Sequence, residues 1–250
     1  MTSYDNFARF YDKLTNDIDY LHRADYFSQL FRRHGAQPRL IVDLACGTGS
    51  LSIALAQAGY EVIGVDRSQG MLCAAEIKNG DSNNGKAMFI CQDICGLDLY
   101  GTVDAAICHL DGINHLTTMA KMRKALDRVS LFLNDGGLFI FDLNTPHKIA
   151  DIYGNNTFIY DYDDIYCVWQ NEYAPKTRIC TFDLTFFEQS GGVYRRFDET
   201  FAEKAYPEHT VKSLLAKAGL LIEAEYDDFS FNKADEASER IIYVARKAGI

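Results

Sequence analysis

The segment from Leu40 to Ser50 (LIVDLACGTGS) combines an apolar run, one acidic residue and two glycines. The apolar run predicts a strand, Gly47 and Gly49 predict a tight turn, and the residues that follow predict a helix. Glycine lets the backbone pass close to a ligand because it has no Cβ to collide with it. A strand, a glycine turn and a helix in this order are typical of sites that bind a nucleotide or nucleoside cofactor.

Three residues around this turn distinguish between the possible cofactors. A dinucleotide-binding turn requires a third glycine, but Ser52 stands at that position. Asp43 lies inside the first strand, where a carboxylate would repel a pyrophosphate but could face an amino group or a sulfonium. Asp66 ends the second strand, about 20 residues on, as needed to accept hydrogen bonds from ribose hydroxyls. The pattern favours a positively charged nucleoside over a dinucleotide, and a nicotinamide oxidoreductase remains the rival hypothesis.

These residues need a parallel sheet to position them. From Leu40 to Asp142, short apolar or β-branched runs alternate with amphipathic stretches, which is typical of βαβ units in an α/β doubly wound sheet. The predicted strands are Leu40–Leu44, Glu61–Val65, Ala87–Cys91, Val103–Ile107 and Gly137–Asp142. The predicted helices are Ser50–Ala58, Ser68–Lys78 and Thr118–Leu133, with stops at Gly59 and at Asn134–Gly137.

The composition changes between Asn155 and Glu203, where aromatic and β-branched runs separated by turn residues predict a small antiparallel meander. After it, Pro207–Ala218 predicts a helix, and Leu220–Asp228 and Arg240–Arg246 predict two final strands. The predicted division of the chain is a helical cap over residues 1–35, an α/β core over 36–152 and 205–250, and an inserted β-meander over 153–204.

Composition narrows the class of protein. The chain has 250 residues, 48% of them hydrophobic and 24% charged, which suits one α/β domain and excludes a disordered or fibrous protein. No apolar run approaches the roughly 20 residues that cross a bilayer, and the first residues lack the pattern of a signal peptide. We therefore expect a cytoplasmic protein without a membrane segment.

Cysteine spacing and net charge exclude further kinds of site. The seven cysteines contain no C-x-x-C pair, so neither a disulfide framework nor a metal site is expected. A formal net charge of −10 argues against a large phosphate-binding surface, because nucleic-acid affinity depends on lysine and arginine.

The motif from Asp43 to Gly49 (DLACGTG), followed by VIGVDRS at 62–68, closely resembles the class I S-adenosylmethionine-dependent methyltransferases. The resemblance continues through FICQDI at 89–94 and LNDGGLFIFD at 133–142. It implies a Rossmann-like seven-stranded sheet with helices on both faces and an inserted antiparallel sheet. The YDNFARFYD segment at 4–12 and the inserted meander are similar to a bacterial branch of small-molecule methyltransferases related to sugar N-methyltransferases.

The resemblance also implies a set of cofactor contacts. Asp43 and the backbone of 45–49 would hold the methionine moiety, Asp66 would bind the ribose, and Met71 and Ile94 would enclose the adenine ring. Asp93 would accept from the adenine amine, Leu110 would lie beside the methionine, and Tyr11 would fold over the cofactor as part of a lid. The whole expected set is Tyr11, Asp43, Ala45, Cys46, Gly47, Thr48, Gly49, Asp66, Arg67, Met71, Gln92, Asp93, Ile94 and Leu110. Two members have structural alternatives, since Asp93 could cap a helix and Met71 could be ordinary core.

Methyl transfer is an in-line displacement from a sulfonium that is already a strong electrophile. The protein must align the reacting atoms, exclude water and, where the acceptor is protonated, remove a proton. Candidates for the base lie just after the fourth strand, at His109, Asp111 and His115. Each has a structural alternative, as a backbone partner, a turn cap or a surface residue. Tyr11 and Tyr20 could also orient an amine or a hydroxyl.

The acceptor itself is left open by the sequence. The leading hypothesis is methyl transfer to a nitrogen or oxygen of a small molecule, by a monomer or homodimer that releases S-adenosyl-L-homocysteine. A tRNA or other nucleic-acid methyltransferase and a non-catalytic cofactor-binding module are the alternatives. The aromatic meander, with Tyr166, Trp169, Tyr194 and Phe201, is predicted either to select the substrate or to form a dimer surface.

Overall fold

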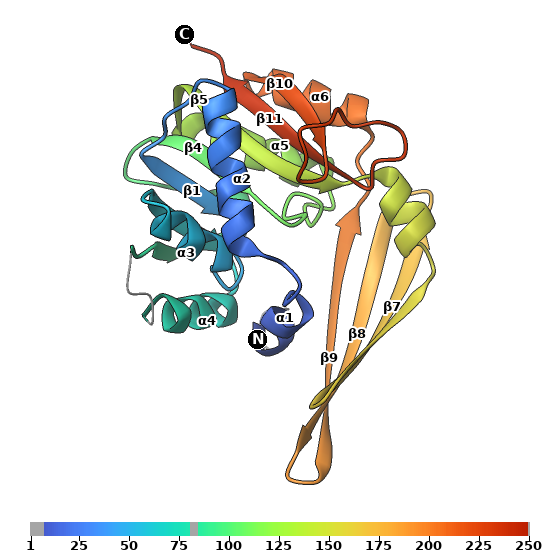
Figure 1. The fold of residues 1–250 in the computed structure, drawn as a ribbon. Coiled ribbons are helices and arrows are strands. Elements are labelled where there is room, and N and C mark those ends of the chain that lie inside the picture. Colours follow the sequence, from blue (N-terminus) through green and yellow to red (C-terminus); the bar gives the residue numbers. More distant parts are fainter. Residues whose placement is uncertain (1–7, 81–84, 250) are drawn as a thin grey trace.

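The computed structural model describes residues 8–80 and 85–249 and contains two β-sheets (Figure 1). The larger sheet has seven strands in the order β10-β11-β5-β4-β1-β2-β3. β1 to β5 are parallel, whereas β11 runs antiparallel to both β5 and β10. The strands are β1 (Leu40–Leu44), β2 (Glu61–Asp66), β3 (Met88–Cys91), β4 (Val103–Cys108), β5 (Leu133–Asn144), β10 (Leu220–Asp227) and β11 (Arg240–Lys247).

Helices cover both faces of this sheet, which confirms the Rossmann-like architecture. Neighbouring β1 residues show the two faces, because Ile41 packs in the core under α2 and α3 whereas Val42 packs in the core under α5 and α6. The helices are α1 (Ala8–Leu14), α2 (Tyr20–Arg33), α3 (Ser50–Gln57), α4 (Gln69–Gly80), α5 (Met119–Phe132) and α6 (Glu208–Lys217). Within residues 8–80 and 85–249, no helix combines the length and apolar character that a membrane crossing requires.

The second sheet follows β5 and a π-type helical turn, η2 (Lys148–Tyr153). It is an antiparallel meander in the order β6-β7-β8-β9, and it extends away from the larger sheet as long strands (Figure 1). Its strands are β6 (Thr157–Tyr162), β7 (Ile165–Ala174), β8 (Ile179–Ser190) and β9 (Val193–Lys204). We call this unit the inserted sheet.

The register of the inserted sheet separates its aromatic residues onto two faces. Trp169 and Phe201 both pack against the buried ring of Phe182, with ring centroids 5.8 Å and 5.1 Å away. Tyr166 pairs with Phe187 on the opposite face, and Tyr194 is exposed. One face therefore forms a small aromatic core, and the other faces solvent.

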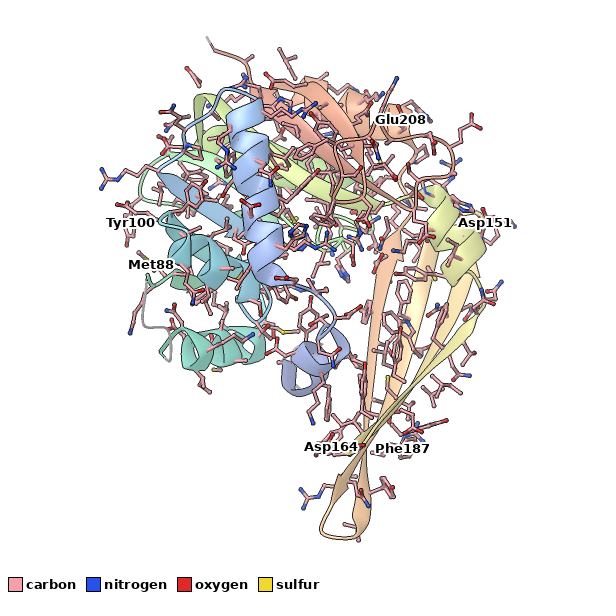
Figure 2. All side chains as sticks on the ribbon, in the orientation of Figure 1. Met88, Tyr100, Asp151, Asp164, Phe187 and Glu208 are labelled. Carbon is pink, nitrogen blue, oxygen red and sulfur yellow. The ribbon has the colours of Figure 1, made fainter. Side chains whose placement is uncertain are left out.

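α1 connects the two sheets. Phe10 is buried and stacks on Phe186 of β8 at 4.8 Å between ring centroids. Lys13 forms an ion pair of 2.5 Å with Asp164, which lies at the turn between β6 and β7, below α1 (Figure 2). On its other side, Asp12 accepts a hydrogen bond from Thr48 Oγ1 at 2.6 Å. The helix thus spans from the inserted sheet to the glycine turn.

The observed elements begin and end close to the predicted ones, with one exception. Asn134–Gly137 was predicted to be a turn, but β5 begins at Leu133 and includes these residues. The reason is that Leu133 already pairs with Val103 of β4, and an irregularity in the ladder absorbs the glycines before pairing resumes at Leu138. Residues 1–7 of the predicted cap, including Tyr4, lie outside the described residues.

Candidate active site

A cavity opens at the carboxyl edge of the sheet, where the strand order reverses between β1 and β4. Ligands of open α/β sheets bind at such a switch point. The cavity is lined by every predicted site residue except Gly49 and Asp111: Tyr11, Asp43, Ala45, Cys46, Gly47, Thr48, Asp66, Arg67, Met71, Gln92, Asp93, Ile94, His109, Leu110 and His115. Tyr20, which was also considered as a residue that orients the acceptor, lines the cavity too, and five further residues complete the lining: Ser50, Leu51, Gly112, Leu116 and Lys121.

The glycine turn holds one carboxylate of the cavity in place. Asp66 accepts hydrogen bonds from the backbone N–H groups of Gly47 at 2.9 Å and Ser68 at 2.8 Å, one on each oxygen. A carboxylate oxygen has two lone pairs, so each still has capacity for a further donor. The turn requires glycine at position 49 for two reasons. Its φ is +72°, and a Cβ there would come within 2.6 Å of the Phe89 ring.

Asp43 is a second, deeper carboxylate. Its Oδ2 accepts a 2.5 Å hydrogen bond from Ser52 Oγ, so the serine that replaces the third glycine is the partner of this acid. The pKa of Asp43 is raised to about 7, because burial and, to a smaller extent, the charge of Asp66 outweigh the lowering effect of the Ser52 hydrogen bond. An ammonium group bound here would stabilise the ionised form.

Another part of the cavity wall is apolar. Ile94 and Met71 are buried there. Asp93 lines the cavity and also caps the short helix that starts at Ile94, because its Oδ1 accepts from Cys95 N–H at 2.7 Å. The capping role considered for Asp93 is therefore present beside its place in the cavity. Met71 likewise lines the cavity while belonging to the core under α1 and the inserted sheet.

The backbone next to the cavity is strained. Among the described residues, four non-glycine residues have positive φ, and three of them flank the cavity: Ala45 (+54°), Leu110 (+54°) and Asp111 (+55°). Such conformations cost of order 1–3 kcal/mol each and concentrate at functional sites. Two of them follow β4 directly, so the strain turns the loop after β4 toward the cavity.

His109 lies on this loop as a buried ring without hydrogen bonds. Neither ring nitrogen has a partner among the described residues. The ring packs edge-to-face between Phe27 and Phe229, with centroids 5.7 Å and 4.9 Å away. Burial, and then the positive charges of Arg240 and Arg23, hold the pKa of His109 well below its usual range. His109 therefore presents a neutral imidazole to the cavity.

Asp111 does not line the cavity but supports it. Its Oδ1 accepts from Arg240 Nη2 at 2.9 Å, and Arg240 Nη1 also pairs with Asp142. Burial would raise the pKa of Asp111, but the charges of Arg240 and His115 together bring it below its usual range. A carboxylate held ionised by a buried guanidinium is a poor proton acceptor, so the geometry does not favour Asp111 as the base.

His115 is the titratable residue that meets both the cavity and this ion-pair group. Its Nε2 lies 4.0 Å from Asp111 Oδ2, and the ring also hydrogen-bonds the backbone of Ala202 in β9. The Phe201 ring lies 5.4 Å away between centroids. Burial lowers the pKa of His115, with Asp111 opposing and Arg67 reinforcing the shift, so the neutral ring predominates at pH 7.

Glu203 of β9 completes the group around Asp111. One ligand atom each from Asp111, His115 and Glu203 lie within 4.8 Å of one another, a spacing that a metal ion would also require. The guanidinium of Arg240 already forms an ion pair with Asp111, and it would repel a metal cation bound beside it. We therefore assign no metal to these residues.

Glu203 and Arg240 were not predicted from the sequence, although the sequence contains some indication of each. Glu203 lies six residues after Phe197 and two residues after Phe201. Because side chains alternate between the two faces of a strand, these spacings place the acid on the apolar face of its strand. Arg240 begins the last predicted strand. Only knowledge that this strand runs antiparallel beside β5 brings it to Asp142.

Lys78 was missed as well. Its Nζ donates to Thr48 at 3.1 Å and Ser50 at 2.7 Å and forms an ion pair with Asp12 at 2.8 Å. It thereby fastens α4 and α1 to the residues that follow the glycine turn.

The residues of the cavity fit a positively charged nucleoside. Asp43 offers an acceptor for an ammonium, Asp66 offers two oxygens to ribose hydroxyls, and Met71 and Ile94 give apolar surfaces for an adenine. A seven-stranded sheet with a reversed final hairpin and this cavity define a class I S-adenosylmethionine-dependent methyltransferase.

Comparisons with known proteins agree. Residues 41–137 match the family described as a methyltransferase domain. The chain is 32% identical to YqeM of Bacillus subtilis (strain 168), which its name describes only provisionally as a methyltransferase, over 98% of this chain and 97% of that protein. A solved S-adenosylmethionine-dependent methyltransferase from Clostridium acetobutylicum ATCC 824 is 34% identical, with a TM-score of 0.89 over 98% of this chain and 99% of that one.

The name of a more distant relative states its methyl acceptors. The glycine/sarcosine N-methyltransferase of Parasynechococcus marenigrum (strain WH8102) is 30% identical over 74% of this chain and 66% of its own length. The solved sugar N-methyltransferase KedS8 from Streptoalloteichus sp. ATCC 53650 shares the fold, with a TM-score of 0.78 over 99% of this chain and 94% of that one, at 20% identity. The chain belongs to the S-adenosylmethionine-dependent methyltransferase family, and S-adenosylmethionine is its methyl donor.

Proposed function

We propose that this methyltransferase transfers the methyl group of S-adenosylmethionine to an amine nitrogen of a small molecule. The observation that carries the proposal is His115, a partly buried imidazole that lines the cavity and whose lowered pKa keeps it neutral. An ammonium acceptor must lose a proton before its lone pair can attack, and a neutral imidazole is suited to take it. The glycine/sarcosine relative supports nitrogen as the acceptor atom.

The cofactor contacts expected from the family belong to the same proposal. Asp43 and the backbone of 45–48 hold the methionine end, Asp66 with Arg67 surrounds the ribose, and Gln92, Asp93, Ile94 and Met71 enclose the adenine. Leu110 and Tyr11 close the cavity beside the methionine. Bound there, the cofactor supplies an electrophilic methyl group, and the chain supplies alignment and the exclusion of water.

His115 and Tyr11 act on the acceptor in this scheme, with His109 as a neutral hydrogen-bond acceptor farther along the cavity wall. Asp111 stays ionised and orients His115. No protein nucleophile would be required, because the acceptor nitrogen would attack the methyl carbon directly as the carbon–sulfur bond breaks and S-adenosylhomocysteine leaves.

We further propose that residues 36–152 and 205–250 form the cofactor-binding core and that 153–204 select the acceptor. Contacts of His115 with Phe201 and Ala202 support this role, because they bring β9 to the proposed base. A dimer surface would instead use the exposed face of the inserted sheet. The seven free thiols suit a reducing compartment, and the cytoplasm is the location we propose.

The test combines binding with turnover. Tritium-labelled S-adenosylmethionine is incubated with the protein and separate sets of small amines, small alcohols and tRNA, and label transfer is measured. We expect transfer to amines, and His115→Ala to abolish it while binding of S-adenosylhomocysteine stays unchanged. The control is His209→Ala, an exposed histidine on α6.

Other outcomes would replace the proposal. Label on alcohols alone would make the acceptor atom oxygen, and label on tRNA alone would make the protein a nucleic-acid methyltransferase. Tight cofactor binding with no transfer to any set would favour the non-catalytic module.

A further inference from the structure

Five side chains from four separate parts of the chain meet beside the cavity, three of them buried and two, Asp111 and His115, partly buried. Asp111 and His115 come from the loop after β4, Asp142 from β5, Glu203 from β9 and Arg240 from β11. Arg240 pairs with both Asp111 and Asp142, and Nε2 of His115 lies 4.0 Å from Asp111. Glu203 is 3% exposed and within 4.8 Å of both Asp111 and His115.

The charges of this group do not balance if every acid is ionised. One guanidinium faces three carboxyl groups, and Arg240 contacts Asp111 and Asp142 directly. A third buried anion next to Asp111 would have no cation of its own, and burying an uncompensated charge is strongly unfavourable. The carboxyl group that can relieve the excess is Glu203.

The hydrogen bonds of Glu203 agree with a bound proton. Its Oε2 accepts from Asn144 Nδ2 at 3.0 Å, so the other oxygen is left to carry a proton. The Glu203 carboxyl group also lies within 4.8 Å of the Asp111 carboxyl group. Two ionised carboxylates this close repel each other and have no hydrogen to share, whereas a proton on one of them allows a hydrogen bond between the two. Burial, and then the charge of Asp111, raise the pKa of Glu203 well above its usual range.

We propose that Glu203 is a positioning residue: as an uncharged carboxylic acid it donates a hydrogen bond to Asp111 and holds that carboxylate against the ring of His115. The proposal rests on the proposed function, in which His115 accepts the proton of the acceptor amine. It gives the inserted sheet a chemical role, because β9 then helps to set how readily His115 is protonated.

The other charged groups near His115 are few. Asp66 and Arg67 act on it from the end of β2, with opposite signs, and Asp111 acts from its own loop. Glu203 faces Asp111 and Arg240, with Lys148 of η2 also close to Asp111. Arg240 holds Asp111 on one side, and Glu203 is the group that holds it on the side of β9.

The test measures the His115 titration by NMR, with S-adenosylhomocysteine bound and no acceptor present. Glu203→Gln keeps an N–H donor toward Asp111 and an oxygen toward Asn144, so we expect the His115 pKa to equal that of the unsubstituted protein. Asp111→Asn removes the stabilising anion, and we expect the His115 pKa to fall by about one unit. Glu203→Ala frees Asp111 to move toward Arg240, and we expect a smaller fall in the same direction.

Infrared difference spectroscopy gives a second readout that does not depend on folding of the alanine variant. We expect the C=O stretch of a protonated carboxylic acid at pH 7 in the unsubstituted protein and its loss in Glu203→Gln. No such difference, or a His115 pKa that falls in Glu203→Gln as much as in Asp111→Asn, would mean that Glu203 is ionised and would overturn the proposal. An unchanged His115 pKa in a folded Glu203→Ala would overturn the positioning role.

These outcomes are separate from those of the proposed function. If no amine is methylated but the His115 titrations follow the expected order, the function proposed for His115 fails while the role of Glu203 stands. If amines are methylated and the titrations do not follow it, only the role of Glu203 fails.

Discussion

The carboxylate of Asp66 accepts a hydrogen bond from the backbone N–H of Gly47 at 2.9 Å, which ties the end of β2 to the turn after β1. The same carboxylate is held by Ser68 N–H on its other oxygen. Two backbone donors therefore fix the orientation of the Asp66 carboxylate, whose oxygens retain capacity to accept hydrogen bonds from a diol.

Replacement of Asp66 should remove most cofactor affinity. Hydrogen bonds to a charged group contribute about 1.5–3 kcal/mol each, so Asp66→Ala should weaken S-adenosylhomocysteine binding by at least about 100-fold. Isothermal titration calorimetry measures the effect. Asp127→Ala, an exposed acid on α5, is the control and should bind as the unsubstituted protein does. Equal affinity in both variants would show that the ribose is bound elsewhere.

Gly49 is expected to tolerate a side chain less well than Gly35. Both have positive φ, +72° and +64°, but a Cβ on Gly35 meets nothing within 4 Å, whereas on Gly49 it meets Phe89 at 2.6 Å and Ala75 at 2.9 Å. Gly35→Ala should cost about 1–2 kcal/mol of unfolding free energy from the backbone alone. Gly49→Ala should cost a further 1–3 kcal/mol, roughly, from overpacking. Denaturant unfolding compares them, and similar costs would mean that the Phe89 ring moves freely.

Cofactor affinity should depend on pH through Asp43. Its pKa of about 7 means that the carboxyl is largely protonated at pH 6 and ionised at pH 8. Because an ammonium prefers the ionised form, the affinity for S-adenosylhomocysteine should rise up to about tenfold per pH unit below 7 and level off above it. Calorimetry from pH 5.5 to 8.5, as a rough range, checks this slope. Asp43→Asn should bind more weakly and without the slope, and a slope that persists in this variant would exclude Asp43 as its source.

The same group should affect stability with the opposite sign. The pKa of Asp43 is raised from 3.8 to about 7 in the folded chain, so between these values the folded state holds a proton that the unfolded state has lost. The contribution of Asp43 to the unfolding free energy should therefore decrease as pH rises from 4 to 7, approximately, and stay constant above that. The contribution of Asp43 is isolated by comparing the pH dependence of the urea unfolding free energy in Asp43→Asn and in the unsubstituted protein. If the unsubstituted protein instead gained stability relative to Asp43→Asn as pH rises, the prediction would be contradicted.

Removal of the Arg240 guanidinium should destabilise the fold strongly. Arg240→Met leaves the buried Asp142 and the partly buried Asp111 without a cation, and breaking a buried pair in this way costs about 3–5 kcal/mol. Arg39→Met, which breaks the exposed pair with Glu61, is the control and should leave the unfolding midpoint unchanged. Adding Asp142→Asn to Arg240→Met should recover part of the loss. Equal midpoints for the two single variants would refute the buried network.

The anchor of α1 on the inserted sheet should support cofactor binding at a distance. Phe10 is 1% exposed and stacks on Phe186, and its neighbour Tyr11 lines the cavity. Phe10→Ala should detach α1 from the inserted sheet and weaken S-adenosylhomocysteine binding by about tenfold. This corresponds to a loss of about 1.4 kcal/mol of binding free energy. Ile159→Ala, on the exposed part of β6, should not change the affinity. Unchanged binding in Phe10→Ala would exclude α1 as a lid.

Much of the cavity lining could be predicted from the sequence because these residues lie within one local pattern. A glycine turn after an apolar run and an acid at the end of the next strand lie within 27 residues, from Leu40 to Asp66. Parallel βαβ geometry then brings the ends of β1, β2 and β4 to one edge without further information. Asp43, Gly47 and Asp66 followed from these rules alone.

The partners of the proposed base did not follow from them, because they come from strands whose order and direction the sequence leaves open. Arg240 reaches Asp142 because β11 runs antiparallel beside β5, so the start of one strand meets the end of the other. Glu203 reaches Asp111 because β9 returns the chain to the loop after β4. Local pattern determined most of the cavity lining, whereas contacts between distant strands decided which charged groups lie next to His115.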